Sequence, residues 1–490
     1  MPFTASDAAR VDAAARAALA DLRPAGFSVG VVSGQDLAFA QGYGFADIES
    51  GKPQHPELRQ RIGSITKTMV GLSLMALVDE GRLSLDDRIV DLVPEVTFHG
   101  DGGDGSDIRL RHMLTHVSGI GEVATPEEMK EITPSLWSDT PDTDLLGLFP
   151  NGVTLEVPPA FKWSYANLAF ALLGEVVSRA EGMTIAQVLQ KRIFGPLGMT
   201  SSDLHDMPHP DLTTGYHWAP GEEAREFAAR DGTPIEDEPT ADGKNIRGKY
   251  QHVRGGGAAG AVQSTVPDMA RYAAALLRRG AGIVKPETFD RMVGPGWAPH
   301  ERLTSWGLSF DRSERHGRRT FGHGGGVLGG WNSMLIVIPG EDLALIVHCN
   351  TAFDTFEQLN KRLLAALLDA PPPNLASPTD IDADVLAAAP GVYEALPGRL
   401  TNFRIMGQVG RIQLSAKDGA LRLHSRRGPW KGGFTLHPAD PQDPDLFHLD
   451  DDPIEPSRVA LDRAPDGAVT GLRFDRLVHM VRADAVKGWV

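Results

Sequence analysis

The sequence predicts a protein of the α+β class, in which a large unit of helices and strands precedes a small antiparallel β-barrel. Three observations support this prediction. Strand-like runs stand near both ends of the first 370 residues, and helix-like runs lie between and around them. A helix that is apolar on almost every face begins at Thr66, which indicates a buried central helix. After a proline-rich stretch at 370–378, short strand-like runs separated by turn residues follow at 391–393, 403–406, 411–415, 421–424, 447–449, 458–462 and 471–476.

The N-terminal part begins with a helix, a pair of strands and then the central helix. An Ala-rich amphipathic run predicts a helix over 6–21, and strands follow at 26–33 and 37–43 with a Gly-Gln-Asp turn between them. The central helix spans 66–78, and Gly81 supplies the left-handed position at which helices commonly end.

Two stretches resemble metal sites only superficially. The loop 101–107 is rich in Asp and Gly but lacks the full ligand pattern and closing Glu of an EF-hand, so a plain surface loop is predicted. His112 and His116 are four residues apart in a short helix that starts at Leu110, and no further ligand lies nearby in the sequence. We therefore expect both histidines to be structural.

The rest of the large unit combines two long polar segments with regular elements. The segments 121–160 and 203–254 are rich in Pro, Gly and acidic residues, which predicts irregular excursions over the surface. The remaining pattern predicts helices at 167–181, 184–192, 264–279 and 354–369, and strands at 306–310, 319–326, 332–339 and 343–348.

Composition disfavours several classes of partner and site. A net charge of −16 and a pI near 5.4 argue against nucleic acid or an anionic membrane as partner. The single cysteine, Cys349, excludes an intramolecular disulfide and a cysteine-cluster metal site. No apolar run is long enough to span a bilayer, and residues 1–22 lack the apolar core of a secretory signal. We therefore expect a cytoplasmic protein.

Ser64 and Lys67 stand at the start of the predicted buried helix. Their spacing of three places both side chains on one face, with Ser64 at the positive end of the helix dipole. A lysine forced towards the interior loses part of its preference for the charged form, so it can act as a base. The hydroxyl beside it then becomes a usable nucleophile. Because Ser-x-x-Lys also recurs by chance at surface helix starts, its significance depends on the other motifs.

Two further groups can serve the same chemistry. Tyr165 and Asn167 are two residues apart, so in an extended run they project to the same side. A phenol beside a lysine can relay protons, and an amide can hold a substrate carbonyl. His323 is the polar group of the glycine-rich run 321–331, where a ligand can approach backbone amides. Taken singly, these patterns fit equally well a core tyrosine and a glycine-rich bulge beside a solvent histidine.

Taken together, the motifs resemble those of the serine β-lactamase and penicillin-binding-protein superfamily. The branch that the chain resembles contains class C β-lactamases, DD-peptidases, D-aminopeptidases and esterases. The resemblance covers about residues 8–370. It rests on Ser64-x-x-Lys67, Tyr165-x-Asn167 and His323-Gly-Gly, in that order, and on the segments 44–47, 114–119, 194–199 and 264–268.

This resemblance implies an antiparallel sheet flanked by helices, with an all-helical subdomain that holds Tyr165. It also implies a mechanism in which Ser64 attacks a carbonyl while Lys67 and Tyr165 exchange its proton. An acyl-enzyme forms and is released by water or an amine. Neither a metal nor another cofactor is implied.

The resemblance further implies where the substrate lies. Asn167, His323 and Gly325 contact the substrate, and the backbone amides of Ser64 and Gly326 form an oxyanion hole. Such a hole typically contributes about 3 kcal/mol per donor to transition-state binding. The implied partner is a small-molecule ester, amide or peptide.

The chain departs from the family pattern at His323, where penicillin-recognising members commonly carry a lysine. Lysine supplies a permanent positive charge for a substrate carboxylate, whereas histidine, with an ordinary pKa of about 6.5, is mostly neutral at pH 7. The His-x-Gly form resembles that of D-aminopeptidases and many esterases. The expected activity is therefore hydrolysis of an ester or amide bond, including bonds in peptides that contain D-amino acids, through a Ser64 acyl-enzyme.

Several alternatives stay open at the level of sequence. An acyltransferase or peptide cyclase would use the same acyl-enzyme with another acceptor. A β-lactamase or DD-peptidase would share the motifs, and the fold also serves non-catalytic sensors and assembly proteins. The acyl group, the stereochemical preference and the oligomeric state, including a homo-oligomer, are not determined by the sequence.

The chain is expected to divide into three parts. These are a β-lactamase-like serine hydrolase domain over 1–370, a Pro-rich linker over 371–382 and a β-barrel domain over 383–490. The last part resembles the lipocalin-like domain that some relatives append. Its acidic loop 442–455 is a candidate to reach the active-site mouth and favour a substrate with a free amine, and the alternative is a solvated turn.

Overall fold

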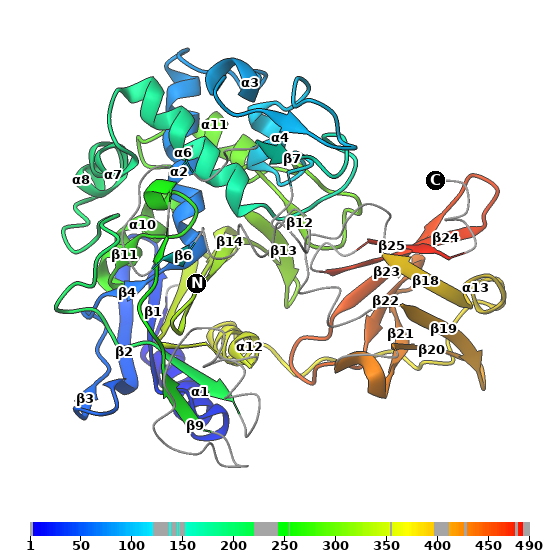
Figure 1. The fold of residues 1–490 in the computed structure, drawn as a ribbon. Coiled ribbons are helices and arrows are strands. Elements are labelled where there is room, and N and C mark those ends of the chain that lie inside the picture. The colour runs from blue at the N-terminus through cyan, green and yellow to red at the C-terminus, as the bar shows by residue number, and fades with distance from the viewer. Residues whose placement is uncertain are drawn as a thin grey trace.

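A large α+β domain is followed by a closed antiparallel barrel of eight strands (Figure 1). This computed structural model describes residues 3–120, 137–138, 145, 147, 152–219, 244–253, 255–352, 355–395, 411–425, 429–475 and 479–483. Most of the irregular segment predicted at 121–160 lies outside these residues. The predicted fold class is confirmed.

An antiparallel sheet of eight strands forms the centre of the large domain. Gly326 pairs with Asn332 and Asn332 pairs with Cys349, so these three residues form one row across the sheet. In sheet order the strands are β12 (Ser305–Trp306), β13 (Asp311–Arg315), β14 (Arg318–Val327), β15 (Trp331–Ile338), β16 (Leu343–Cys349), β1 (Gly26–Ser33), β2 (Asp36–Asp47) and β3 (Lys52–Pro53).

Helices cover both faces of this sheet (Figure 1). One face carries α1 (Ala5–Leu22) and α12 (Phe356–Leu367), which come from the two ends of the domain. The other face carries α2 (Thr66–Asp79) and α10 (Val266–Leu277). Because successive strand residues point to opposite faces, the central strands contribute to two separate hydrophobic cores.

Helix α2 is the buried helix that the sequence predicts. Every residue from Thr66 to Leu77 is buried. Gly71 permits a close contact, because a Cβ at this position would lie 2.1 Å from Ser309 Oγ. The helix ends at Glu80, and Gly81 adopts the predicted left-handed conformation with a φ of 71°.

A helical subdomain packs around α2 at the top of Figure 1. The helix predicted at 184–192 begins with a capping box between Thr184 and Gln187, and it passes into a π-helical turn at Gln190–Phe194. The helices are α3 (Ile89–Leu92), α4 (Leu110–Leu114), α6 (Asn167–Glu181), α7 (Ile185–Leu189) and α8 (Gly195–Leu197), while α11 (Pro286–Met292) lies further along the chain.

Parts of the segment 203–254 are more ordered than the sequence suggests. Strands β8 (Tyr216–Ala219) and β9 (Lys244–Arg247) pair with each other, and β17 (Thr351–Ala352) joins β8 in parallel. The expectation of a surface excursion is wrong here, because polar residues of this segment are partners of buried groups. Asp206, for example, accepts a hydrogen bond from the fully buried Arg61.

Three short strand pairs complete the large domain. They are β4 (Gln60–Arg61) with β11 (Gln263–Ser264), β5 (Phe98–His99) with β7 (Val153–Thr154), and β6 (Trp137–Ser138) with β10 (His252–Val253).

The edge of the large sheet differs from the prediction. The strand expected over 306–310 is only the two-residue β12, because the chain turns at Ser309, whose φ is 71°. The next strand, β13, has the sequence Asp-Arg-Ser-Glu-Arg and is absent from the prediction. Its charges hide its strand character, because they form ion pairs with the C-terminal domain rather than facing water.

The C-terminal barrel is filled by its own side chains. Its core contains buried apolar residues from every strand, and residues of α13 (Ala383–Ala388) pack against the same core. Helix α13, β21 and β25 are absent from the prediction, and the strand expected at 403–406 lies outside the described residues. The strands are β18 (Gly391–Ala395), β19 (Ile412–Lys417), β20 (Ala420–Ser425), β21 (Phe434–Asp440), β22 (Asp443–Leu449), β23 (Arg458–Arg463), β24 (Val469–Phe474) and β25 (His479–Arg482).

The acidic loop of the barrel docks onto the large domain. Glu455 forms a two-pronged ion pair with Arg315 of β13, with the shortest N–O distance at 2.6 Å. Asp452 lies 3.0 Å from Lys361 of α12, and both of these side chains are at most 8% exposed. The loop is therefore not a solvated turn. These two carboxylates neutralise protein cations, so they do not serve to attract a substrate amine.

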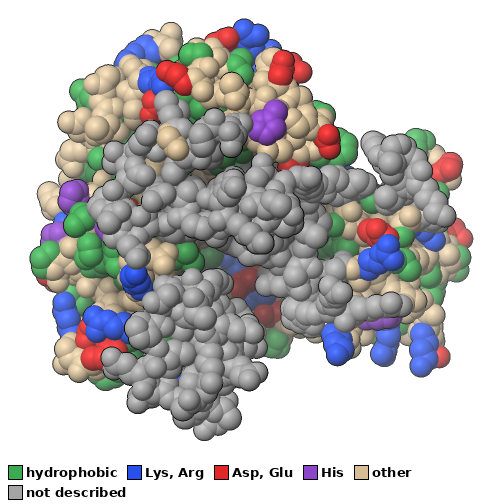
Figure 2. Space-filling model, viewed as in Figure 1, with side chains coloured by type: hydrophobic (Ala, Val, Ile, Leu, Met, Phe, Trp, Pro, Cys, Tyr) green, Lys and Arg blue, Asp and Glu red, His purple; other side chains and the backbone are tan. Residues whose placement is uncertain are grey.

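The outer surface bears on membrane and nucleic-acid partners. Among the described residues, no helix combines the length and the apolarity needed to cross a membrane. On the face that Figure 2 shows, basic and acidic side chains occur near one another on both the large domain and the barrel.

Candidate active site

Ser64 lies in a 3-10 turn, Gly63–Ile65, that runs directly into α2. Gly63 has a φ of 54°, and a Cβ there would lie 2.7 Å from the backbone nitrogen of Gly326. Only glycine satisfies both conditions, so the local sequence lets β14 approach the turn. Ser64 itself is half-buried at this junction.

Lys67 connects Ser64 to two other segments. Its side chain is fully buried, and Nζ donates hydrogen bonds to Ser64 Oγ at 2.9 Å, Asn167 Oδ1 at 2.8 Å and the Ala259 carbonyl at 2.5 Å. Nζ also lies 5.1 Å from the ring centroid of Tyr165, within reach of a cation–π interaction. The ring centroid of Phe170 is 5.8 Å from Nζ, so hydrogen-bond acceptors and aromatic rings together hold Lys67 beside the serine.

Tyr165 and Asn167 reach Lys67 from the start of α6. Asn167 is the first residue of this helix, and Ala166 before it has the extended conformation of an N-cap. Tyr165 is half-buried, with its ring stacked on the imidazole of His116 at a centroid distance of 4.2 Å. The structure therefore brings both predicted residues to the same lysine.

His323 is buried on β14 and faces the same aromatic group. Its ring lies 6.1 Å from that of Tyr165 and 5.4 Å from that of Trp306. Burial and the nearby Lys67 charge lower the pKa of His323 to about 3, although the carbonyl of Gly324, 2.5 Å from Nδ1, opposes the shift. The imidazole is therefore neutral at physiological pH.

The glycines after His323 pack against the chain that leads to Ser64. A Cβ on Gly325 would lie 2.0 Å from the carbonyl oxygen of Ile62, so no larger residue fits without a shift. Ser333 on the neighbouring strand donates a hydrogen bond to that same carbonyl at 2.7 Å. Gly326 is exposed and lies next to the turn that carries Ser64.

Some contributors to this cluster are absent from the sequence prediction. The Ala259 carbonyl holds Lys67, and the signal for it is the glycine-rich run 255–260, which lets the backbone approach closely. Trp306 lies between the rings of His116 and His323, with centroids at 5.0 and 5.4 Å, and no local pattern marks it. His116 belongs to the resembling segment 114–119, yet its spacing from His112 suggested only a structural role.

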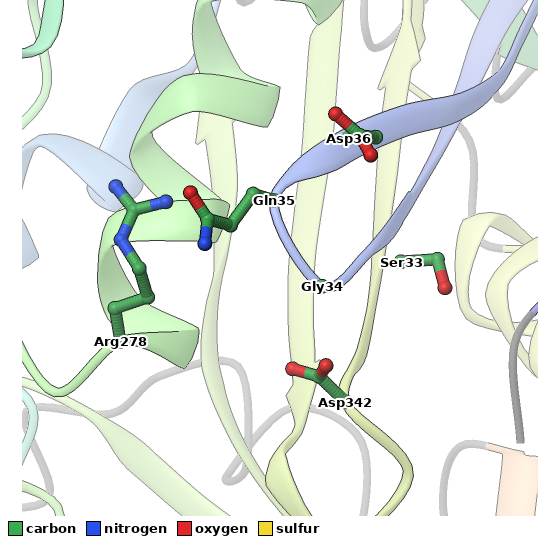
Figure 3. A pocket seen from close by; sticks show the side chains of 6 residues that line it. All are labelled: Ser33, Gly34, Gln35, Asp36, Arg278 and Asp342. Atoms are coloured by element: carbon green, nitrogen blue, oxygen red, sulfur yellow. The ribbon is translucent and has the colours of Figure 1, made fainter.

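A polar crevice elsewhere on the large domain is separate from this cluster. Figure 3 shows the hairpin between β1 and β2 with Arg278 and Asp342 on either side of it. β1 begins level with the row of Gly326 and ends at Ser33, at the opposite end of the sheet. The residues that line the crevice are Ser33, Gly34, Gln35, Asp36, Arg278 and Asp342.

No group of three or more His, Cys, Asp or Glu side chains within the described residues is arranged to hold a metal ion.

Comparison with known proteins identifies the large domain. A family model described as beta-lactamase matches residues 11–369. The esterase EstB of Burkholderia gladioli is 31% identical over 238 residues, which are 47% of this chain and 59% of that protein. The chain thus spans less than two thirds of that esterase.

Two solved structures illustrate the similarity of fold. The octameric penicillin-binding protein homologue from Pyrococcus abyssi is 20% identical with a TM-score of 0.57, covering 97% of this chain and 99% of that one. The D-amino acid amidase from Ochrobactrum anthropi SV3, complexed with D-phenylalanine, is 22% identical with a TM-score of 0.59, covering 74% of this chain and 99% of that one.

Proposed function

Because this chain belongs to the β-lactamase family, we propose that it is a serine hydrolase that cleaves ester or amide bonds through an acyl-enzyme on Ser64. The observation that carries the proposal is the hydrogen bond of 2.9 Å between Lys67 Nζ and Ser64 Oγ. A fully buried lysine that contacts a half-exposed serine beside a tyrosine supplies a nucleophile with a route for its proton.

In the proposed first step, Ser64 Oγ attacks the substrate carbonyl carbon, and its one proton is accepted by whichever of Lys67 and Tyr165 is deprotonated in the free enzyme. The same groups return a proton to the leaving alcohol or amine as its bond to the carbonyl carbon breaks. Water then attacks the acyl ester, and the proton route runs in reverse to regenerate Ser64. The cycle consumes one water for each bond cleaved.

The proposed substrate contacts follow from the same cluster. The amides of Ser64 and Gly326 stabilise the developing oxyanion, and each such donor contributes about 3 kcal/mol. Asn167, His323 and Gly325 line the substrate, and the carbonyl of Ala259 together with Asn167 keeps Lys67 in place.

The neutral state of His323 supports an ester or amide substrate over one that must present a carboxylate. A group whose pKa is about 3 carries no positive charge at pH 7 to attract an anion. The rings of Trp163 and Trp306 lie 5.4 Å apart beside it, which makes this wall aromatic. Together these features favour an apolar acyl group, and the similarity to an esterase agrees with an ester as substrate.

The first test compares four chromogenic substrates on purified full-length protein. We expect turnover of p-nitrophenyl butyrate or of D-alanine p-nitroanilide, with less of the L-anilide and of nitrocefin. Ser64→Ala should abolish turnover. Ser73→Ala is the matched control, because Ser73 lies on the same buried helix and its hydroxyl bonds only the Met69 carbonyl among described residues.

Each alternative function predicts a different outcome. Labelling of the wild type, but not of Ser64→Ala, by a fluorophosphonate probe separates an enzyme from a non-catalytic sensor or assembly protein. Nitrocefin as the best substrate would make the protein a β-lactamase, and preferential transfer of the acyl group to an added amine would make it an acyltransferase or cyclase.

A further inference from the structure

His116 has an unusual backbone conformation beside the candidate active site. It follows α4, and its φ of 57° lies in the left-handed region that residues with a side chain rarely occupy. Its side chain is fully buried. Such conformations persist where several surrounding contacts fix them, and they cluster at functional sites.

Two hydrogen bonds join His116 to the residues on either side of Tyr165. The His116 carbonyl accepts from the N–H of Ser164 at 2.8 Å. The ring nitrogen Nδ1 accepts from the N–H of Ala166 at 3.1 Å. The imidazole also stacks on the Tyr165 ring, with centroids 4.2 Å apart and planes inclined by 27°. One residue therefore holds the backbone before Tyr165, the backbone after it and the ring itself.

The bond to Ala166 defines the tautomer of His116. A backbone N–H can only donate, so Nδ1 carries no proton and the neutral ring is protonated at Nε2. Burial and the charge of Lys67 keep the pKa of His116 well below its usual value, which preserves this acceptor. Ala166 is fully buried at the start of α6, so its N–H would be costly to leave without an acceptor.

We propose that His116 is a positioning residue for Tyr165. It fixes the tyrosine at the start of α6 so that the phenol stays beside Lys67 during proton transfer. The proposal rests on the proposed role of Tyr165, and it assigns His116 a function in the reaction rather than a merely structural one.

Three variants separate the contacts of His116. In His116→Phe an aromatic ring can still stack on Tyr165, but Nδ1 is lost. In His116→Asn the side-chain oxygen stands where Nδ1 stands, and asparagine tolerates a positive φ. His116→Ala loses both features. His112→Asn is the matched control, because His112 Nδ1 also accepts a backbone N–H, from Arg109 at 3.2 Å, and His112 lies four residues before His116.

The expected kinetic result is a loss in kcat with little change in KM. A displacement of about 1 Å in a catalytic group can cost about 100-fold in rate, so we expect a loss of that order for His116→Phe and His116→Ala. His116→Asn should recover to within about tenfold of wild type, as a substitute acceptor would allow. His112→Asn should match wild type. Wild-type kcat in His116→Phe, or equal losses in the Asn and Ala variants, would overturn the proposal.

A double-mutant cycle distinguishes action through Tyr165 from a general loss of packing. If His116 acts by positioning the phenol, adding His116→Asn or His116→Phe to Tyr165→Phe should cause no further loss of rate. Independent, multiplicative losses would contradict the proposal. If Tyr165→Phe alone keeps the wild-type rate, the proposed proton route fails instead, so the two failures are distinguishable. If the Phe and Ala variants do not fold, His116→Asn is compared in the wild type and in Tyr165→Phe. A loss of rate in the wild type alone supports positioning through Tyr165, and an equal loss in both contradicts it.

Discussion

At the scale of single residues, burial keeps His323 and His348 of the large domain neutral at physiological pH. His323 and His348 both have a pKa lowered to about 3 by burial, and the Lys67 charge adds to the effect at His323. His323 therefore presents a neutral ring at the candidate site. His348 on β16 has no hydrogen-bond partner at either ring nitrogen among the described residues. Protonation of this buried ring would therefore be costly in the folded protein.

We predict that His348 makes the protein less stable in mild acid. The unfolded imidazole titrates near pH 6.5, whereas the folded one stays neutral to about pH 3, so only the unfolded chain gains a proton between these values. The stabilisation by the neutral ring is thus complete above pH 6.5 and decreases by roughly 1.4 kcal/mol per pH unit below it. The free energy of unfolding, measured in urea at pH 7.5, 6.5 and 5.5, should therefore decrease less steeply towards acid in His348→Leu than in the wild type.

The control for this prediction is His55→Leu, because the His55 side chain is 61% exposed and remains solvated in the folded protein. That variant should follow the wild-type dependence on pH. An unchanged slope in His348→Leu would show that the ring is protonated, or hydrated, inside the fold.

At the scale of elements, the close approach of β14 to the turn before α2 assembles the candidate site. Gly63 and Gly325 permit the approach, and Ser333 on β15 bonds the Ile62 carbonyl between them. Because α2 is buried along most of its length, the turn has little freedom to follow a displaced strand. The spacing between Ser64 and β14 therefore depends on the absence of side chains at two positions.

We predict that Gly325→Ala lowers kcat/KM by about 100-fold, which is the cost of a displacement of about 1 Å. The new Cβ would lie 2.0 Å from the Ile62 carbonyl and 2.4 Å from Ser333 Oγ, so β14 must move away from Ser64. Gly324→Ala is the control on the same strand, since the nearest atom to its Cβ would be the flexible end of Met334, at 3.3 Å, and the backbone oxygen of Ser333 would be at an ordinary 3.9 Å. Equal effects of the two substitutions on ester hydrolysis would contradict this account.

At the scale of the whole molecule, the barrel is attached to the large domain by charged side chains. Besides the Arg315–Glu455 and Lys361–Asp452 pairs, Asp475 of the barrel accepts hydrogen bonds from the N–H and hydroxyl of Thr304, at 3.0 and 3.2 Å. Thr304 is two residues before Trp306. The barrel therefore contacts the same segment that supplies an aromatic wall of the candidate site.

We predict that Glu455→Gln destabilises the docked state by about 3 kcal/mol, because it leaves Arg315 largely buried without its counter-charge. Both side chains are at most 17% exposed. Glu394→Gln is the matched control, since Glu394 pairs within the barrel with Arg411, which is 70% exposed, and such a pair contributes at most about 1 kcal/mol. Urea unfolding of the full chain, followed by tryptophan fluorescence, measures both, and similar losses would contradict a buried pair.

Local patterns were sufficient for much of the fold. Helix α6 lies at 167–181 as predicted, and α2 is apolar on all sides and buried. Six of the eight described barrel strands correspond to predicted short runs between turns, whereas β21 and β25 are absent from the prediction. These features depend on residues within one helix or one strand, which the sequence displays directly. The same is true of the spacing between Ser64 and Lys67, although the chemical roles of both residues stay proposals.

Only the tertiary structure revealed features that depend on residues distant in sequence. The charged strand β13 and the acidic loop each appear solvated when considered alone, and each is neutralised by the other domain. His116 appears to be an ordinary helix-end histidine until residues 164 and 166 bond to it. A polar group carries no sign in the sequence of which distant partner will satisfy it, because burial and pairing are decided when the chain folds.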